Sequence, residues 1–345
     1  MLEKMNPGRV SFVELDETQR FKYLFFALGA CIEGFNSMRK VIIVDATSIK
    51  NVYGGVLIVA SAKDPDHHHY PIAFGVVDSE NNASWTWFFS KLKSIIPDFT
   101  ELVFCSDRHQ SLIMSISTVY PLSHHGYCIY HLSQNVKLSC KNVNRDLVAT
   151  TFMQVAKAYT ESEFEKLYAD FIKRFPAAVE SINGVFRFLR AYALLPMIDA
   201  IVAKLAECVT GVDGSSYVVD LKNKTCYCKQ FDIDRYPYLH AIDVAMEAAK
   251  NAGHEINEIQ LHELCSKYYW MEQWALGYSR TIYPVPIMSM WIVPDNVRAL
   301  VVFPKFYVIK RGRKPTKRIK STGEHGRKKK KSTIASWFES QGSQS

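Results

Sequence analysis

Two aspartates stand at the ends of strand-like segments, where their carboxylates are suited to holding a divalent cation. Asp45 follows the apolar residues 41–44, and Asp107 follows the segment ELVFCS at 101–106. Burying a lone carboxylate beside such a strand is costly unless it has a partner or a metal ion. Mg²⁺ and Mn²⁺ prefer carboxylate oxygens, so the two aspartates are compatible with a metal site. The pattern by itself favours aspartates that only cap loops or face solvent, and the surrounding sequence, described below, favours the metal site instead.

The elements that must position these acids follow the order β-β-β-α-β-α-β. Gly54-Gly55 and the DPDHHH segment are turn signals between the first three strands. This order predicts an α/β protein with an RNase H-like fold, a mixed five-stranded sheet with flanking helices. In that fold the first and fourth strands are neighbours, so Asp45 and Asp107 would meet. We expect strands at 41–45, 54–64, 70–79 and 101–107, and a short fifth strand or a strand-to-helix junction at 125–132. Helices are expected at 82–96, 108–120 and from 133 to about 209.

Composition and charge narrow the class of protein further. Of the 345 residues, 48% are apolar and 22% are charged, which is ordinary for a globular protein. No apolar run is long enough to cross a membrane, and the N-terminus has no signal-peptide pattern. The eight cysteines are too sparse for a disulfide scaffold. The sequence therefore predicts a soluble protein of a reducing compartment that does not interact with membranes.

The positive charge is concentrated in a tail. Residues 305–331 hold thirteen lysines and arginines and one acid, Glu324, whereas residues 1–304 have a small net negative charge. Gly, Pro, Ser and Thr separate these charges without apolar periodicity, so we expect residues 305–345 to be disordered. Two basic clusters predict a nuclear-import signal and a phosphate-binding arm, and a purely solubilising tail is the alternative. The candidate DNA-binding residues are Lys310, Arg311, Arg313, Lys314, Lys317, Arg318, Lys328, Lys329, Lys330 and Lys331.

The segment from 41 to 92, VIIVDATSIKNVYGGVLIVASAKDPDHHHYPIAFGVVDSENNASWTWFFSKL, resembles the core of plant-type Mutator-like element (MULE) transposases. The shared patterns are D-x-T/S-x-x-K, Y-G-G-x-L and E-N-x-x-S-W-x-W-F. The later segment SDRHQSLIMSISTVYPLSHHGYCIYHLSQN resembles the family's second-aspartate segment with its C-x-x-H element. The resemblance covers roughly residues 6–240. It implies an RNase H-like catalytic core at 39–205, which we expect a helical lead-in at 1–38 to precede.

The resemblance also implies a third carboxylate. The segment AAVESINGVFRFLRAYALLPMIDAI at 177–201 matches the family's A-E-S-x-N helix, which assigns Glu180 to the metal site. The insertion that usually precedes this glutamate in the family is shorter here. In such DDE sites, three acids hold two Mg²⁺ or Mn²⁺ ions that cleave and transfer strands of double-stranded DNA. The catalytic residues would be Asp45, Asp107 and Glu180, supported by Cys128, His131, Asn183 and Arg190.

Residues 206–250 resemble a SWIM-type zinc finger, whose pattern is C-x-C followed by C-x-H. Cys226, Cys228 and His240 match, and Tyr238 stands where the third cysteine is expected. This implies a Zn²⁺ site whose fourth ligand is water, Cys208 or Cys265. A helical and Pro-rich segment is expected at 251–304. Since Met1 falls shortly before the core, we expect the family's N-terminal DNA-binding domain to be absent.

Two functional hypotheses remain open at the level of sequence. The first is a nuclear DDE transposase that acts on double-stranded DNA and uses no small-molecule substrate. The second is a catalytically inactive, transposase-derived DNA-binding or transcription-regulatory protein, or a truncated element fragment. Homo-oligomer formation is open under either hypothesis.

Overall fold

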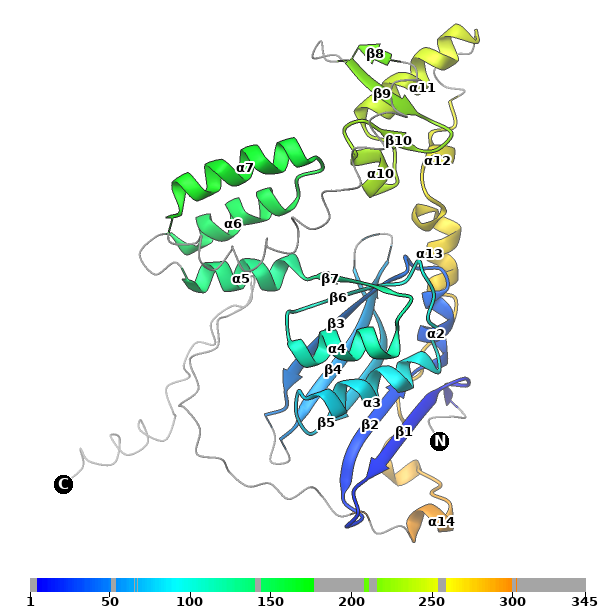
Figure 1. Cartoon of the computed structure of the whole chain (residues 1–345). Helices are drawn as coiled ribbons and strands as arrows, with labels where there is room; N and C mark the ends of the chain where they lie inside the picture. Colours follow the sequence, from blue (N-terminus) through cyan, green and yellow to red (C-terminus); the bar gives the residue numbers. More distant parts are fainter. Residues whose placement is uncertain are drawn as a thin grey trace, which may run out of the picture. The chain divides into compact units, whose positions relative to one another are not determined.

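The structure, a computed structural model, describes residues 5–50, 54–64, 66, 68–139, 144–176, 208–210, 216–253, 259–299 and 302 (Figure 1). The chain divides into two compact units, Met1–Phe306 and Tyr307–Ser345. All described residues belong to the first unit.

A mixed seven-stranded sheet forms the largest part of this unit, in the order β1-β2-β5-β4-β3-β6-β7. The first five strands in this order pair antiparallel, whereas β3–β6 and β6–β7 are parallel. The strands are β1 (Val10–Leu15), β2 (Phe21–Ala27), β3 (Val41–Ser48), β4 (Val56–Lys63), β5 (His69–Val77), β6 (Val103–Ser106) and β7 (His124–Tyr127).

Four of the expected strands are present and the segment 125–132 is a strand-to-helix junction, with β7 ending at Tyr127 and a helix from Ile129, but the expected helical lead-in at 1–38 is wrong. β1 and β2 form a hairpin that extends the sheet, and only the short helix α2 (Gly29–Phe35) follows it. Tyr23, Phe25 and Ala27 alternate with less buried residues along β2, so one face of the strand enters the core. This alternation of burial, which the nearly all-apolar sequence does not reveal, is that of a strand. The sheet therefore has seven strands and not five.

Two helices cover one face of the sheet, as Figure 1 shows: α3 (Asn82–Lys93) and α4 (Gln110–Val119). The Asn81 side chain accepts a hydrogen bond from the backbone N–H of Ser84 and so caps α3. The packed aromatic side chains beneath the helices are Trp85, Phe88, Phe89, Phe104 and Tyr120, each fully buried. Burial of each such side chain contributes about 1.5–3 kcal/mol.

The alternation of burial along β3 places Asp45 on the opposite face from α3 and α4. Ile42 and Val44 are buried in the core, whereas Ile43 is only partly buried and Asp45 is exposed. Successive strand residues point to opposite faces of a sheet. The apolar residues of this strand thus anchor it in the core and leave the carboxylate of Asp45 accessible.

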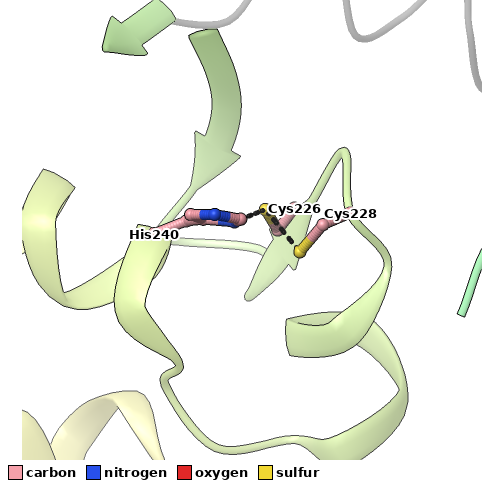
Figure 2. Close-up of side chains that lie close together, drawn as sticks. All are labelled: Cys226, Cys228 and His240. Carbon is pink, nitrogen blue, oxygen red and sulfur yellow. Dashed lines mark hydrogen bonds between the residues drawn. The ribbon is translucent and has the colours of Figure 1, made fainter. Parts of the chain in front are cut away.

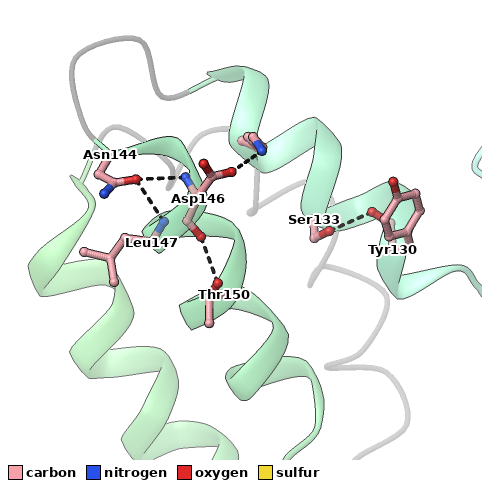
Figure 3. A network of polar contacts seen from close by, with 7 residues as sticks. Tyr130, Ser133, Asn144, Asp146, Leu147 and Thr150 are labelled. Atoms are coloured by element: carbon pink, nitrogen blue, oxygen red, sulfur yellow. Dashed lines mark hydrogen bonds and ion pairs between the residues drawn. The ribbon is translucent and has the colours of Figure 1, made fainter. Parts of the chain in front are cut away.

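Three helices follow the sheet: α5 (Ile129–Ser139), α6 (Arg145–Ala156) and α7 (Glu161–Arg174). Their apolar faces form a separate core that includes Val136, Phe152 and Phe171. The Asn144 side chain accepts hydrogen bonds from the first backbone N–H groups of α6, as Figure 3 shows. Asp146 at the start of the same helix pairs with Lys137 of α5, so polar contacts as well as packing join the two helices.

A second, three-stranded sheet of order β10-β9-β8 lies further along the chain. Val219, Cys226 and Phe231 belong to its small core. The elements of this region and of the segment after it are β8 (Cys208–Thr210), β9 (Ser216–Asp220), β10 (Thr225–Cys226), α10 (Gln230–Asp234), α11 (Leu239–Asn251), α12 (Leu261–Leu264), α13 (Met271–Gly277) and α14 (Asp295–Arg298), with short 3₁₀ turns at Lys267–Tyr269 and Met288–Met290.

Helix α13 packs against α2 at two glycines. A Cβ atom added to Gly34 would lie 2.0 Å from the Tyr70 hydroxyl and 2.4 Å from the Gly277 carbonyl oxygen, so only glycine fits there. The Tyr70 hydroxyl lies 3.0 Å from that same carbonyl oxygen. Tyr278 donates a hydrogen bond to the buried Asp64 at 2.8 Å. These contacts fix the segment after the finger region against the first sheet.

Candidate functional site

The pairing of β3 with β6 brings Asp45 and Asp107 to the same end of two adjacent strands. The strands are parallel, and Ile43 lies opposite Cys105. Asp45 lies two residues beyond Ile43 within β3, and Asp107 follows directly after β6, which ends at Ser106. Adjacent strands lie about 4.8 Å apart. Two carboxylates at this spacing can share a divalent cation.

The two carboxylates have different surroundings. The Asp45 side chain is 61% exposed, and its Oδ1 lies 3.9 Å from Nε2 of His131. Asp107 is partly buried, and its Oδ1 accepts the backbone N–H of His109 at 3.0 Å. The site therefore combines one accessible carboxylate with one that the following turn holds in place.

A hydrogen-bonded pair fixes the backbone at Asp107. Ser106 is fully buried and its hydroxyl donates to the Asp107 carbonyl oxygen at 3.0 Å. Its Oγ also lies 2.8 Å from Nε2 of His125 on the neighbouring strand β7. Because burial lowers the pKa of His125, we assign a neutral ring that donates through Nε2. Neither Ser106 nor His125 was expected from the sequence.

Cys128 continues the row of Asp45 and Asp107 onto the third parallel strand. Cys105 lies opposite Gly126, so Asp107 is level with Cys128, whose backbone N–H donates to the Ser106 carbonyl oxygen at 2.7 Å. A hydrogen bond from the Cys105 thiol lowers the pKa of Cys128, and backbone N–H groups at the start of α5 add to this effect. The same contact raises the pKa of Cys105. Of the expected residues, His131 lies 3.9 Å from Asp45, and Cys128 follows β7 where its backbone N–H contacts the residue before Asp107.

Other expected residues of the site lie outside the described part of the chain. Glu180, Asn183 and Arg190 belong to residues 177–207, and the basic residues of the tail belong to 303–345. Their assignments stay predictions. No helix among the described residues is long and apolar enough to cross a membrane.

A second cluster of metal-ligating atoms lies in the finger region, as Figure 2 shows. The ligand atoms of Cys226, Cys228 and His240 all lie within 4.8 Å of one another. The two sulfurs are 3.2 Å apart, and Cys226 Sγ is 3.7 Å from His240 Nδ1. Two thiols and an imidazole at these distances suit a tetrahedral Zn²⁺ site. The three residues grouped from their sequence spacing are thus adjacent in space.

Local structure explains how these three ligands meet. Cys226 ends β10, and its backbone N–H donates to Asp232 Oδ2 at 2.7 Å, which holds the turn between the two cysteines and α10. His240 lies in the first turn of α11, directly after the N-terminal cap residue Tyr238 and Leu239. The Tyr238 ring is edge-on to the His240 ring, with centroids 6.4 Å apart. The strand end and the helix start thus set the geometry.

Comparison with known proteins bears on the first of these sites. The family model for the MULE transposase domain matches residues 41–135, which run from β3 into α5 and include Asp45, Asp107, Cys128 and His131. The chain contains a MULE transposase domain. This match confirms the resemblance noted from the D-x-T/S-x-x-K and C-x-x-H patterns. The Cys226, Cys228 and His240 cluster lies outside the matched residues.

Two relatives illustrate the range of proteins that resemble this MULE domain. A transposase for the insertion sequence element IS905 of Lactococcus lactis subsp. lactis is 24% identical over 138 residues, which cover 39% of the chain and 35% of that protein. Protein FAR-RED IMPAIRED RESPONSE 1 of Arabidopsis thaliana is 20% identical over 179 residues, covering 50% of the chain and 21% of that protein. The matched part of the chain therefore spans about a third of the length of the IS905 transposase and about a fifth of the length of FAR-RED IMPAIRED RESPONSE 1.

Proposed function

We propose that this protein is a MULE transposase-derived, RNase H-like enzyme that cleaves and transfers DNA strands with the help of divalent cations. The observation that supports the proposal is the parallel pairing of β3, which contains Asp45, with β6, which Asp107 directly follows, within the matched domain. The strand order β5-β4-β3-β6-β7, with helices on one face, supports an RNase H-like fold. The substrate would be double-stranded DNA.

Asp45 and Asp107, with Glu180 as the proposed third acid, would hold Mg²⁺ or Mn²⁺. Divalent cations held by these carboxylates would supply Lewis-acid activation of an attacking water or hydroxyl and stabilisation of the leaving oxygen. Asp45 presents an exposed carboxylate to the metal, while Ser106 and His125 hold the backbone of Asp107. His131, 3.9 Å from Asp45, orients that carboxylate through its Nε2 atom. Fixed ligands of this kind avoid reorganisation during the reaction.

Zinc and DNA binding by the other regions complete the proposal. Cys226, Cys228 and His240 would bind Zn²⁺ in a SWIM-like module at 206–250, after a catalytic core at 39–205. The basic residues of 305–331 would bind DNA phosphates and direct the protein to the nucleus. Residues 251–304 would form the segment that returns to the first sheet, which the contacts of Tyr70 and Tyr278 support.

A second candidate is a non-catalytic, transposase-derived regulatory protein that binds DNA. The similarity over half of the chain to FAR-RED IMPAIRED RESPONSE 1, whose name denotes a response and not transposition, favours this candidate. In that case the carboxylates would remain without a catalytic role.

The deciding experiment is a Mg²⁺- or Mn²⁺-dependent nicking assay on supercoiled double-stranded DNA. We expect Asp45→Asn, Asp107→Asn and Glu180→Gln each to reduce the nicking rate by about 100-fold or more, because each removes an anionic metal ligand. Asp66→Asn, at an exposed turn residue, is the matched control and should retain the wild-type rate. Wild-type protein that binds DNA and metal but never nicks would favour the regulatory candidate.

A further inference from the structure

The Cys226, Cys228 and His240 cluster has three ligands where a closed structural zinc site has four. The structure places no fourth His, Cys, Asp or Glu of the described residues at the same spacing from all three. A set of two thiolates and one imidazole is also the donor set of zinc sites that keep one position open. The described side chains therefore fit a zinc site with three protein ligands, whereas the side chain of Cys208, the other candidate from the sequence, lies outside the described ones.

Side chains near the cluster are engaged elsewhere. Asp232 Oδ2 accepts the backbone N–H of Cys226, and Asp232 Oδ1 lies 3.6 Å from the Lys229 ammonium group. Cys265 contacts the Leu261 carbonyl oxygen through its sulfur at 3.8 Å. Tyr238, at the position of the third cysteine in the SWIM pattern, offers a neutral phenol, which is a poor replacement for a thiolate.

Large apolar side chains next to the ligands in the sequence are exposed. They are Tyr227 (65% exposed), Ile233 (54%), Tyr238 (40%) and Leu239 (59%), and they precede or follow the three ligands closely. Their exposure leaves the surroundings of Cys226, Cys228 and His240 in the sequence accessible to another molecule.

We propose that Cys226, Cys228 and His240 bind Zn²⁺ with an exchangeable fourth position that accepts a thiolate from another molecule. Zn²⁺ with two thiolates and a neutral imidazole has no net charge, and a third thiolate completes a Cys₃His-type donor set of the soft kind that zinc prefers. The proposal rests on the zinc binding proposed above. The thiolate comes either from a small thiol or from a cysteine of a second protein copy, and the experiment below distinguishes these sources.

The test uses the full chain loaded with Co²⁺ in place of Zn²⁺ in thiol-free buffer under argon. The absorption of Co²⁺ reports its coordination, and the sulfur-to-cobalt band scales with the number of bound thiolates. We expect titration with 2-mercaptoethanol to shift the wild-type spectrum saturably and to raise that band about 1.5-fold, as two thiolates become three. Tyr238→Phe, which keeps the ring, should respond as the wild type does.

Tyr238→Cys is the decisive variant, because it supplies the missing ligand within the chain. Its spectrum should have the higher band intensity before any thiol is added and should not respond to 2-mercaptoethanol. Higher intensity in undiluted wild type that falls on dilution would identify a cysteine of a second copy as the source. A sulfur-to-cobalt band of wild type that is already intense and stays intense on dilution would contradict an exchangeable fourth position. A spectrum of bound Co²⁺ that does not change when 2-mercaptoethanol is added would also contradict it. Failure of wild type to bind Co²⁺ at all would overturn the zinc binding itself.

Discussion

At the scale of single residues, the Ser106–His125 pair decides how rigidly Asp107 is held. We expect Ser106→Ala to weaken Mn²⁺ binding at the carboxylates by about 10-fold or more, because groups that orient a metal ligand affect metal affinity. Isothermal titration of Mn²⁺ measures this. Ser133→Ala is the matched control, since Ser133 is also buried and its hydroxyl donates to a backbone carbonyl, that of Tyr130, within α5 (Figure 3). Equal Mn²⁺ affinity in the two variants would contradict the role of Ser106.

The sequence pointed to Asp45 and Asp107 as candidate metal ligands, but it did not point to Ser106 and His125, which hold the backbone at Asp107. Asp45 and Asp107 each end an apolar run, and this local pattern is readable without a structure. Ser106 and His125 are nineteen positions apart, and their contact depends on the register of β6 against β7. Nothing in the composition around His125 sets that register. The CSDRH and HHGYC segments do contain both residues, so the signal was present only as part of the family motif.

At the scale of elements, the approach of α13 to α2 depends on Gly34. We expect Gly34→Ala to reduce the free energy of unfolding by about 1–3 kcal/mol, because its Cβ would force the Tyr70 hydroxyl and the Gly277 backbone apart. Urea denaturation measures this change. Gly126→Ala is the control, since a Cβ there would meet no atom within 4 Å. A Gly34 variant as stable as the wild type would show that the two helices separate without cost.

The same contact should depend on pH through its tyrosines. Burial raises the pKa of Tyr70, and burial together with the hydrogen bond to Asp64 raises that of Tyr278 to about 12. Such groups stay protonated longer in the folded protein than in the unfolded chain. Stability should therefore be complete below about pH 10 and fall as pH rises towards about 12. Urea denaturation across this range should show a smaller fall for Tyr278→Phe than for Tyr130→Phe, an exposed control. Equal losses of stability in the two variants would contradict a role of Tyr278 in this pH dependence.

The elements that the sequence analysis missed are β1 and β2. The FKYLFFA segment is apolar at nearly every position, so its period cannot separate a strand from a helix. The pairing of Phe25 with Gly75 of β5 decides the outcome, because it places β2 at the edge of the existing sheet. The core strands expected at 41–45 and 101–107 were predictable because each is a short run of strand-forming residues that ends at an aspartate.

At the scale of the whole molecule, the excess positive charge is concentrated near the end of the chain. Residues 1–304 are slightly negative and hold the carboxylates proposed to act on DNA, which is itself an anion. Residues 305–331 hold thirteen lysines and arginines. Attraction of DNA should therefore come mainly from the tail, while the folded unit supplies the chemistry.

Deletion of residues 305–331 tests this division. Each phosphate contact contributes about 0.9 to the slope of log affinity against log salt concentration. We expect the deletion to reduce the magnitude of that slope by the equivalent of several phosphate contacts. Fluorescence anisotropy of labelled double-stranded DNA between about 50 and 200 mM salt measures the slope. Deletion of 332–345, which removes one acid, Glu339, and no lysine or arginine, is the control and should leave the slope steep. An unchanged slope after removing 305–331 would place the phosphate contacts on the folded unit, and a basic surface there would have to oppose its net negative charge.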